Sequence, residues 1–232
     1  MRQYPNGAKK ALTFSYDDGV KQDKRLIEIF NKYGLKATFN LNFGLLNKEE
    51  QWERNGVAIK RLSFEEVKTI YTGHEVACHG LMHKTLPELS TMEKEYEIAE
   101  DKNNLEKLFN KHVAGMAYSF GKVDNESISI MKRYNIDYGR VVEPTLQFGI
   151  PKNWYRWQPT SHHNHSDIFG LIENYINLNT DKLSLLYIWG HSYEFDVDNN
   201  WEHIENCAKM LAGHDDIWYC TNKEFYNFIG RE

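Results

Sequence analysis

The chain has 232 residues, of which 41% are hydrophobic and 14% aromatic, so it can bury a sizeable core and is not a disordered protein. Its net charge of -5 leaves no basic excess to neutralise phosphates, which argues against nucleic-acid binding. No apolar run is long enough to cross a bilayer, and residues 1–14 lack the apolar stretch of a signal peptide. We therefore expect a cytoplasmic protein without a membrane partner, although a chain trimmed of its leader would look the same. Three cysteines are an odd and sparse set, which favours free thiols.

Short strand-like runs alternate with amphipathic segments along the whole chain, and no linker divides it, so we expect a single domain over residues 1–232. The predicted strands are residues 11–16, 36–41, 75–78, 113–118, 138–142, 184–189 and 216–220. Helical spacing of apolar residues predicts a helix over residues 23–33. Three capping boxes mark further helix starts: Ser63 with Glu66, Ser90 with Glu93, and Thr221 with Glu224.

Repeated strand, helix, strand order implies an α/β fold with parallel pairing through right-handed crossovers. Seven strands can close a distorted barrel or form an open, doubly wound sheet. Polar residues directly follow most of the predicted strands, as in Asp17-Asp18-Gly19, His79-Gly80-Leu81-Met82-His83, Ser119-Phe120-Gly121 and Gly190-His191. In a (β/α) barrel these strand ends share one face, where active sites form, and this clustering favours the barrel.

A histidine pair and an acid pair are the sharpest chemical signals. His79 and His83 are four residues apart, so both imidazoles can face one ion if the segment is helical. Asp17 and Asp18 are adjacent carboxylates, which repel each other unless a cation compensates them. Taken separately, the two histidines are typical of a surface pair, and the Asp-Asp-Gly segment is typical of a turn. Together they favour a catalytic divalent metal that keeps positions open for water and substrate.

These motifs resemble those of the polysaccharide deacetylases, the NodB-homology family also called carbohydrate esterase family 4. SYDDG (residues 15–19) is similar to the first motif, GLKATFNLNFG (34–44) to the second strand, HGLMH (79–83) to the H-[ST]-x-x-H motif, and GH (190–191) to the last motif. The resemblance runs in order from about residue 11 to residue 228. It implies a distorted (β/α)7 barrel and metal-dependent removal of acetyl groups from sugars.

The resemblance also assigns roles to individual residues. It implies three metal ligands, Asp18, His79 and His83, for a divalent ion that we expect to be zinc, with cobalt or another ion as alternatives. Asp17 would be the general base that takes a proton from the attacking water. His191 would be the general acid that protonates the leaving amine. The backbone N–H of Phe120 would face the developing oxyanion.

Three family features are altered in this chain. Gly80 replaces a Ser or Thr that could brace the histidine loop, and Ala117 stands where the family has an arginine that orients the base. The Asp-rich fourth motif is not visible, and WYRWQP (residues 154–159) lies in roughly its place. We hypothesise that Arg156 approaches from this loop and orients Asp17. The equally weighted alternative is that Arg156 is a solvated loop residue.

Aromatic residues near the predicted site face could stack on sugar rings, which present flat apolar faces. Trp154, Trp157 and Tyr193 are the candidates for this substrate cleft. The histidine-rich segment SHHNH (residues 161–165) carries no carboxylate or cysteine, so we expect an exposed loop. If it is functional, it more readily lines the sugar cleft than binds an ion.

The leading hypothesis is a metal-dependent deacetylase of an N-acetylated sugar or polysaccharide. The same residues could serve an O-acetyl esterase acting on a substrate such as acetylxylan, because an ester has a better leaving group. The altered third and fourth motifs also suit a glycan-binding protein that has lost turnover. Iron and oxygen chemistry at two histidines and a carboxylate is geometrically possible but leaves Asp17 and His191 unexplained. The sugar, the native metal and the oligomeric state stay open.

Overall fold

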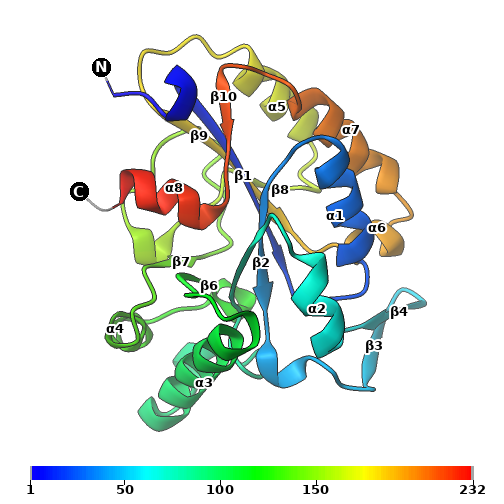
Figure 1. The fold of residues 1–232 in the computed structure, drawn as a ribbon, viewed down its shortest axis with the longest axis vertical. Coiled ribbons are helices and arrows are strands. Elements are labelled where there is room, and N and C mark those ends of the chain that lie inside the picture. Colours follow the sequence, from blue (N-terminus) through cyan, green and yellow to red (C-terminus); the bar gives the residue numbers. More distant parts are fainter. Residues whose placement is uncertain (1, 231–232) are drawn as a thin grey trace.

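The computed structural model describes residues 2–230, and its centre is a curled sheet of parallel strands (Figure 1). The strand order is β7-β6-β5-β2-β1-β9-β8, and β10 pairs with β1 outside this path. The strands are β1 (Lys10–Asp17), β2 (Ala37–Leu41), β5 (Glu75–Cys78), β6 (Gly115–Ala117), β7 (Tyr138–Arg140), β8 (Ser161–His162), β9 (Ser184–Gly190) and β10 (Ile217–Tyr219). This half-barrel of parallel strands and surrounding helices confirms the predicted distorted (β/α)7 barrel.

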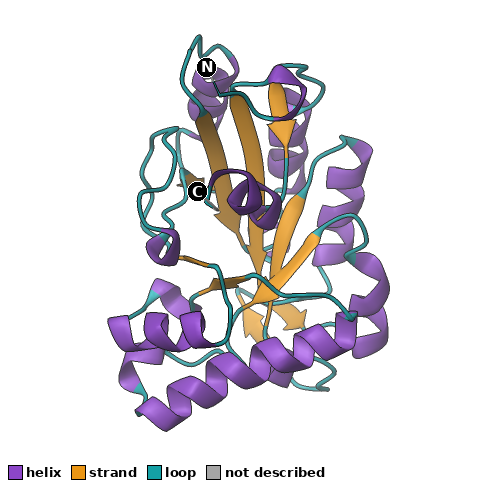
Figure 2. Cartoon of the chain, turned by 60° about the vertical axis from the view of Figure 1, so that its left-hand side comes forward, coloured by secondary structure: helices purple, strands orange, loops and turns teal. Residues whose placement is uncertain are grey.

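Helices flank the curled sheet on its outer side (Figure 2). They are α1 (Asp23–Lys32), α2 (Phe64–Ile70), α3 (Thr91–Phe109), α4 (Asn125–Arg133), α5 (Ile168–Ile176), α6 (Glu194–Val197), α7 (Trp201–Leu211) and α8 (Asn222–Ile229). Short 3-10 turns occupy Pro5–Gly7, Phe43–Leu45, Leu86–Glu88, Ser119–Gly121 and Trp154–Arg156. All three predicted capping boxes form, at the starts of α2, α3 and α8. No helix of the described residues is long and apolar enough to cross a membrane.

The core lies where the helices cover the sheet. Every residue of β1 is buried, as expected for a central parallel strand that is covered on both faces. Phe14 of β1 packs on Phe30 of α1 with ring centroids 4.6 Å apart, and Phe39 of β2 packs on Tyr71 at 4.7 Å. The three cysteines are free and buried, which confirms the prediction of free thiols.

Each of the seven predicted strands overlaps an observed one, but three short strands were not predicted. Strand β8 has only two residues, too few to produce a periodic pattern. Strands β3 (Gln51–Arg54) and β4 (Val57–Lys60) form an antiparallel hairpin outside the main sheet. The signal for this hairpin is the pair Asn55 and Gly56, both with positive φ, because Asn-Gly favours the turns that join two antiparallel strands.

Candidate active site

The structure brings most of the predicted site residues to the carboxyl-terminal end of the sheet. Asp17 ends β1, His79 follows β5 and His191 follows β9. Strand β1 pairs with both β2 and β9, and β2 pairs with β5, so these chain segments meet although they are far apart in sequence. Parallel strands place such ends on one face, which is where (β/α) barrels carry their sites.

We call Asp18, His79 and His83 the metal-side cluster, because each offers a ligand atom and these atoms lie within 4.8 Å of one another. Nδ1 of His79 is 2.8 Å from the carbonyl oxygen of Ala117, and a carbonyl only accepts, so the ring proton sits on Nδ1. The opposite nitrogen, Nε2, is buried and has no hydrogen-bond partner within the described part of the chain, so it is the ring atom that can face a metal ion. Burial and the nearby His79 lower the pKa of His83 to about 4, which keeps it neutral at pH 7, as a metal ligand must be. These three residues fit a divalent cation.

Helix α3 supports the loop that carries the two histidines. The buried carboxylate of Asp101 accepts a hydrogen bond from the backbone N–H of His79 at 3.0 Å. The Glu97 carboxylate accepts from the N–H of Met82 at 2.9 Å. Gly80 itself has φ = 82°, a left-handed conformation that favours glycine over the Ser or Thr of the family motif. The loop is thus braced by carboxylates of α3 in place of a local hydroxyl.

Asp17 is held at both carboxylate oxygens. Asn40 donates to Oδ1 at 2.8 Å, and the guanidinium of Arg140 donates to Oδ2. Burial alone would raise the pKa of Asp17, but the Arg140 guanidinium, together with the neighbouring imidazoles of His79 and His191, outweighs it and the net shift is downward. The carboxylate therefore stays ionised and in one orientation, although only 2% of the residue is exposed.

The prediction that Arg156 orients Asp17 is wrong. Arg156 donates instead to the carbonyl of Val123 at 3.3 Å and to the side chain of Asn125 at 3.2 Å. The cation beside Asp17 is Arg140, the last residue of β7, which pairs directly with Ala117 of β6. The arginine that contacts Asp17 thus lies on the strand next to Ala117. The available signal was a charged residue inside the otherwise buried strand predicted at 138–142.

On the other side of the site, Glu194 gathers three histidines; we call His162, His163, His191 and Glu194 the acid-side cluster. Glu194 Oε2 lies 3.1 Å from Nε2 of His162 and 3.2 Å from Nε2 of His163, and its Oε1 lies 3.4 Å from Nδ1 of His191. Burial opposes ionisation of Glu194, but the contacts with the three histidines outweigh it and lower its pKa. Burial likewise disfavours the charged form of His191, yet the contact with Glu194 and the charges of Asp18 and Asp17 raise its pKa overall. Glu194 was not predicted, and its only sequence signal is its position three residues after His191.

The expectation of an exposed loop at residues 161–165 is wrong for its central part. His163 is fully buried, and its ring stacks on Tyr16 at 5.6 Å with planes 15° apart. Burial lowers the pKa of His163 to about 3, so the ring is neutral. Gly190 permits this packing, because a Cβ at that position would lie 2.0 Å from Nδ1 of His163. His162 is the more open of the two, with 27% of its side chain exposed.

Of the two tryptophans proposed for the substrate cleft, Trp157 belongs to the core and Trp154 is a partly buried residue that packs against it. Trp157 is 1% exposed and stacks on Phe225 at 5.6 Å, and Trp154 packs edge-on against Trp157. They lie in a hydrophobic cluster beneath the amino-terminal segment and α8, so their assignment to the cleft is wrong. Tyr193 does lie beside the site, with its ring centroid 5.1 Å from that of His191.

Phe120 follows β6 in a 3-10 turn and has φ = 57°. Its exposed ring lies edge-on to His83, with ring centroids 4.7 Å apart. The residue whose backbone N–H is the candidate oxyanion donor is thus next to the metal-side cluster.

The β3–β4 hairpin borders both clusters. Arg61, directly after β4, pairs with Asp18 at 3.1 Å. Arg54 at the end of β3 approaches Glu194 at 3.4 Å. Trp52 of the same hairpin lies edge-on to Tyr193, 5.8 Å between centroids. Arg54, Arg61 and Trp52 therefore form one wall of the site. The sequence patterns predicted no strand in this hairpin.

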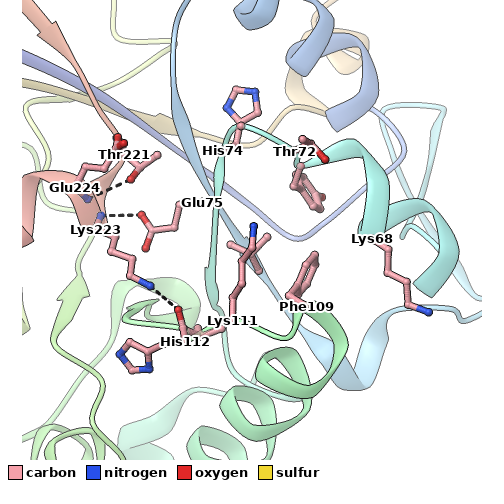
Figure 3. A pocket seen from close by; sticks show the side chains of 14 residues that line it. Lys68, Thr72, His74, Glu75, Phe109, Lys111, His112, Thr221, Lys223 and Glu224 are labelled. Carbon is pink, nitrogen blue, oxygen red and sulfur yellow. Dashed lines mark hydrogen bonds between the residues drawn. The ribbon is translucent and has the colours of Figure 1, made fainter.

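A separate pocket of about 230 Å³ lies at the opposite end of β5, where Glu75 begins the strand (Figure 3). Glu75 accepts hydrogen bonds from Thr38, Tyr138 and the backbone of Lys223, and burial raises its pKa. These bonds saturate the carboxylate with partners from three other segments. The buried carboxylate at this pocket is thus part of a structural hydrogen-bond network. It lies at the start of β5, whereas His79 lies just after the end of that strand.

Comparison with known proteins identifies the class. Residues 5–139 match the family model described as polysaccharide deacetylase, and this segment is more than half of the chain. The chain therefore belongs to the polysaccharide deacetylase family. No curated protein matches the sequence.

Solved structures show the same fold. A Mycobacterium smegmatis protein named for this class is 12% identical over 99% of this chain and 93% of its own, with a TM-score of 0.70. BC0361, a polysaccharide deacetylase from Bacillus cereus, is 25% identical over 62% of this chain, with a TM-score of 0.52. The Streptococcus pyogenes deacetylase PplD in complex with acetate is 23% identical over 56% of this chain, with a TM-score of 0.50. The alignments span only 44% of the Bacillus chain and 55% of the Streptococcus chain.

Proposed function

We propose that this family member is a metal-dependent hydrolase that removes acetyl groups from an N-acetylated sugar or polysaccharide. The observation that carries the proposal is the pairing of an ionised carboxylate, Asp17, with a proton-holding imidazole, His191, at the ends of the adjacent strands β1 and β9. Amide hydrolysis needs both a base for water and an acid for a poor leaving group.

Asp18, His79 and His83 would hold the divalent ion, which we expect to be zinc. The neutral imidazole of His83 and the unpartnered Nε2 of His79 support this assignment. When bound, such an ion lowers the pKa of water and stabilises negative charge on an acyl oxygen.

Asp17 takes the proton from the attacking water in this proposal. Its two oxygens are fixed by Asn40 and Arg140, so one lone pair is presented in a constant direction. Arg140 also keeps the pKa of Asp17 low, which makes the carboxylate fully available as a proton acceptor near neutral pH.

His191 delivers the proton to the leaving nitrogen. Its raised pKa keeps the imidazole protonated to a higher pH than an unperturbed histidine. Glu194 is a positioning residue, because its contact with Nδ1 leaves the opposite ring nitrogen, Nε2, to face the substrate. The backbone N–H of Phe120 donates to the acyl oxygen as negative charge develops on it.

The test is acetate release from a panel of N- and O-acetylated sugars and oligosaccharides, using chelator-treated and metal-restored protein. We expect release only with metal, and a fall of roughly 10²- to 10⁴-fold in kcat/KM for Asp17→Asn, the range for loss of a general base. Release from O-acetyl substrates alone would identify the esterase alternative. No release from any substrate with any metal would overturn the hydrolase and favour a glycan-binding protein.

A further inference from the structure

We propose that the acid-side cluster is a second transition-metal site, in which His162, His191 and Glu194 bind a zinc-like divalent cation and thereby silence the general acid. The cluster is separate from the metal-side cluster, whose residues follow β1 and β5. Its ligands come from β8, from the residue after β9 and from the start of α6.

The donor atoms are already gathered. One ligand atom from each of His162, His191 and Glu194 lies within 4.8 Å of the others. Tetrahedral zinc with bonds of about 2.0–2.1 Å requires neighbouring ligand atoms roughly 3.4 Å apart. Nε2 of His162 lies 3.1 Å from Oε2 of Glu194 and Nδ1 of His191 lies 3.4 Å from Oε1, so each imidazole is near this spacing from one oxygen of the carboxylate. Two imidazoles and a carboxylate suit zinc, copper or nickel in preference to magnesium or calcium.

Neighbouring groups hold these ligands in their binding orientation. The backbone N–H of Asn164 donates to Nδ1 of His162 at 3.1 Å, which turns Nε2 toward Glu194. The buried ring of His163 and the backbone N–H of His191 both approach Oε2 of Glu194, at 3.2 Å and 3.3 Å. Such supporting contacts fix ligand orientation in metal sites and spare the cost of ordering them on binding.

The site is open to solvent and carries one competing cation. The side chains of His162 and His191 are 27% and 20% exposed, so an ion can reach them without opening the core. Arg54 of the hairpin approaches Oε1 of Glu194 at 3.4 Å and lies over the ring of Tyr193 at 5.9 Å, and its side chain is 52% exposed. A bound metal ion would displace this guanidinium, so Arg54 weakens the site without blocking it.

A metal ion bound at the acid-side cluster would also affect catalysis, and this step of the inference rests on the proposed function. A ring nitrogen of His191 that binds a metal ion must give up its proton, because the same lone pair cannot serve both. His191 then cannot be an imidazolium and cannot protonate the leaving group. Zinc beyond the amount that fills the metal-side cluster is therefore expected to inhibit amide hydrolysis.

The first test counts zinc ions, by equilibrium dialysis with zinc alone followed by elemental analysis. We expect two equivalents for the full chain, one for His162→Gln, one for His83→Gln and none for the double variant. His165→Gln is the matched control and should retain two, because His165 belongs to the same segment but its ring accepts a hydrogen bond from the backbone N–H of Asp167 at 3.2 Å. One equivalent in the full chain that disappears in His83→Gln would overturn the proposal.

A second variant, Arg54→Ala, tests the second zinc site without changing any of its ligands, in case a histidine variant folds poorly. Arg54→Ala removes the competing cation from an exposed position, so it should tighten binding of the second equivalent severalfold and leave the first unchanged. Equal affinities in Arg54→Ala and the unaltered chain would contradict a site at Glu194.

The inhibition is measured as a ratio within each variant, acetate release with excess zinc divided by release at one equivalent. We expect at least a roughly hundredfold fall for the unaltered chain and for His165→Gln, the lower end of the range for loss of an acid catalyst. The ratio should stay near one for His162→Gln. If the chain releases no acetate, the proposed function fails while the zinc count still decides the second site. Two bound ions with undiminished amide hydrolysis would overturn the silencing of His191.

Discussion

The metal-side and acid-side clusters use the same kinds of residue but hold protons in opposite ways. In the metal-side cluster the pKa of His83 is lowered to about 4, and Nε2 of this ring is 3.8 Å from Asp18, whose Oδ1 also pairs with Arg61. In the acid-side cluster Glu194 contacts His191 directly and the pKa of that histidine is raised. At His83, burial and the neighbouring His79 outweigh the charge of Asp18, so this imidazole is neutral and ready to bind metal. At His191, the contact with Glu194 and the charges of Asp18 and Asp17 outweigh burial, so this imidazole holds its proton to higher pH and can act as an acid.

Each cluster is also supported by a buried aspartate behind it. Asp101 of α3 accepts backbone N–H groups, those of His79 and Phe43. Asp23 of α1 accepts hydroxyl groups, those of Ser192 and Tyr71. Burial raises the pKa of both aspartates to about 7. The two aspartates differ in their partners. A backbone N–H can only donate a hydrogen bond, whereas a hydroxyl can also accept one.

The largest effect that tests the comparison between the two clusters is expected from removal of the general acid, His191. His191→Ala should lower kcat/KM for an N-acetylated substrate roughly 10²- to 10³-fold, because a positioned general acid contributes in this range. The fall for an O-acetylated substrate should be much smaller, since an ester has the better leaving group. Parallel acetate-release kinetics on both substrates measure the difference. A negligible loss on the amide would remove His191 from the role of acid.

The next effect concerns the cation that orients the base. Arg140→Ala should lower kcat/KM by up to roughly 10²-fold, the cost of a misplaced catalytic group. Arg140 lowers the pKa of Asp17, so its removal raises that pKa and moves the acid limb of the kcat/KM profile to higher pH. Arg140→Lys keeps the positive charge but lacks the planar guanidinium, so its kcat/KM should lie between those of the unaltered chain and Arg140→Ala. Arg156→Ala is the matched control and should leave the profile in place, because Arg156 bonds to Val123 and Asn125. An unmoved acid limb in Arg140→Ala would contradict the assignment.

The smallest effect separates the two buried supports. In Asp101→Asn an amide N–H must face a backbone N–H, so unfolding free energy at pH 8 should fall by about 1–3 kcal/mol. In Asp23→Asn the hydroxyls of Ser192 and Tyr71 can rotate to accept, so the change should stay within about 1 kcal/mol or be stabilising. Urea unfolding of both variants provides the comparison. Equal losses would show that the partners of the two aspartates do not matter.

Local sequence patterns predict much of this fold and the metal-side cluster. The capping boxes and the apolar periodicity report contacts between residues within a few positions of one another. The segments SYDDG and HGLMH likewise each keep their functional residues within five consecutive positions, and the family match ends at residue 139. The acid-side cluster lies beyond that match, and of its four residues only His191 was assigned a role from sequence.

The sequence by itself determined an α/β chain of alternating strands and helices, with acids and histidines placed directly after the strands. Only the tertiary structure decided which of these groups meet. Arg140 reaches Asp17 because β7 pairs with β6 in a register that sets Arg140 beside Ala117, and His163 and Glu194 meet because the two-residue strand β8 joins β9 at the sheet edge. Register between parallel strands depends on hydrogen bonds between segments that are distant in sequence and on packing against the helices. No local pattern of residues carries that information.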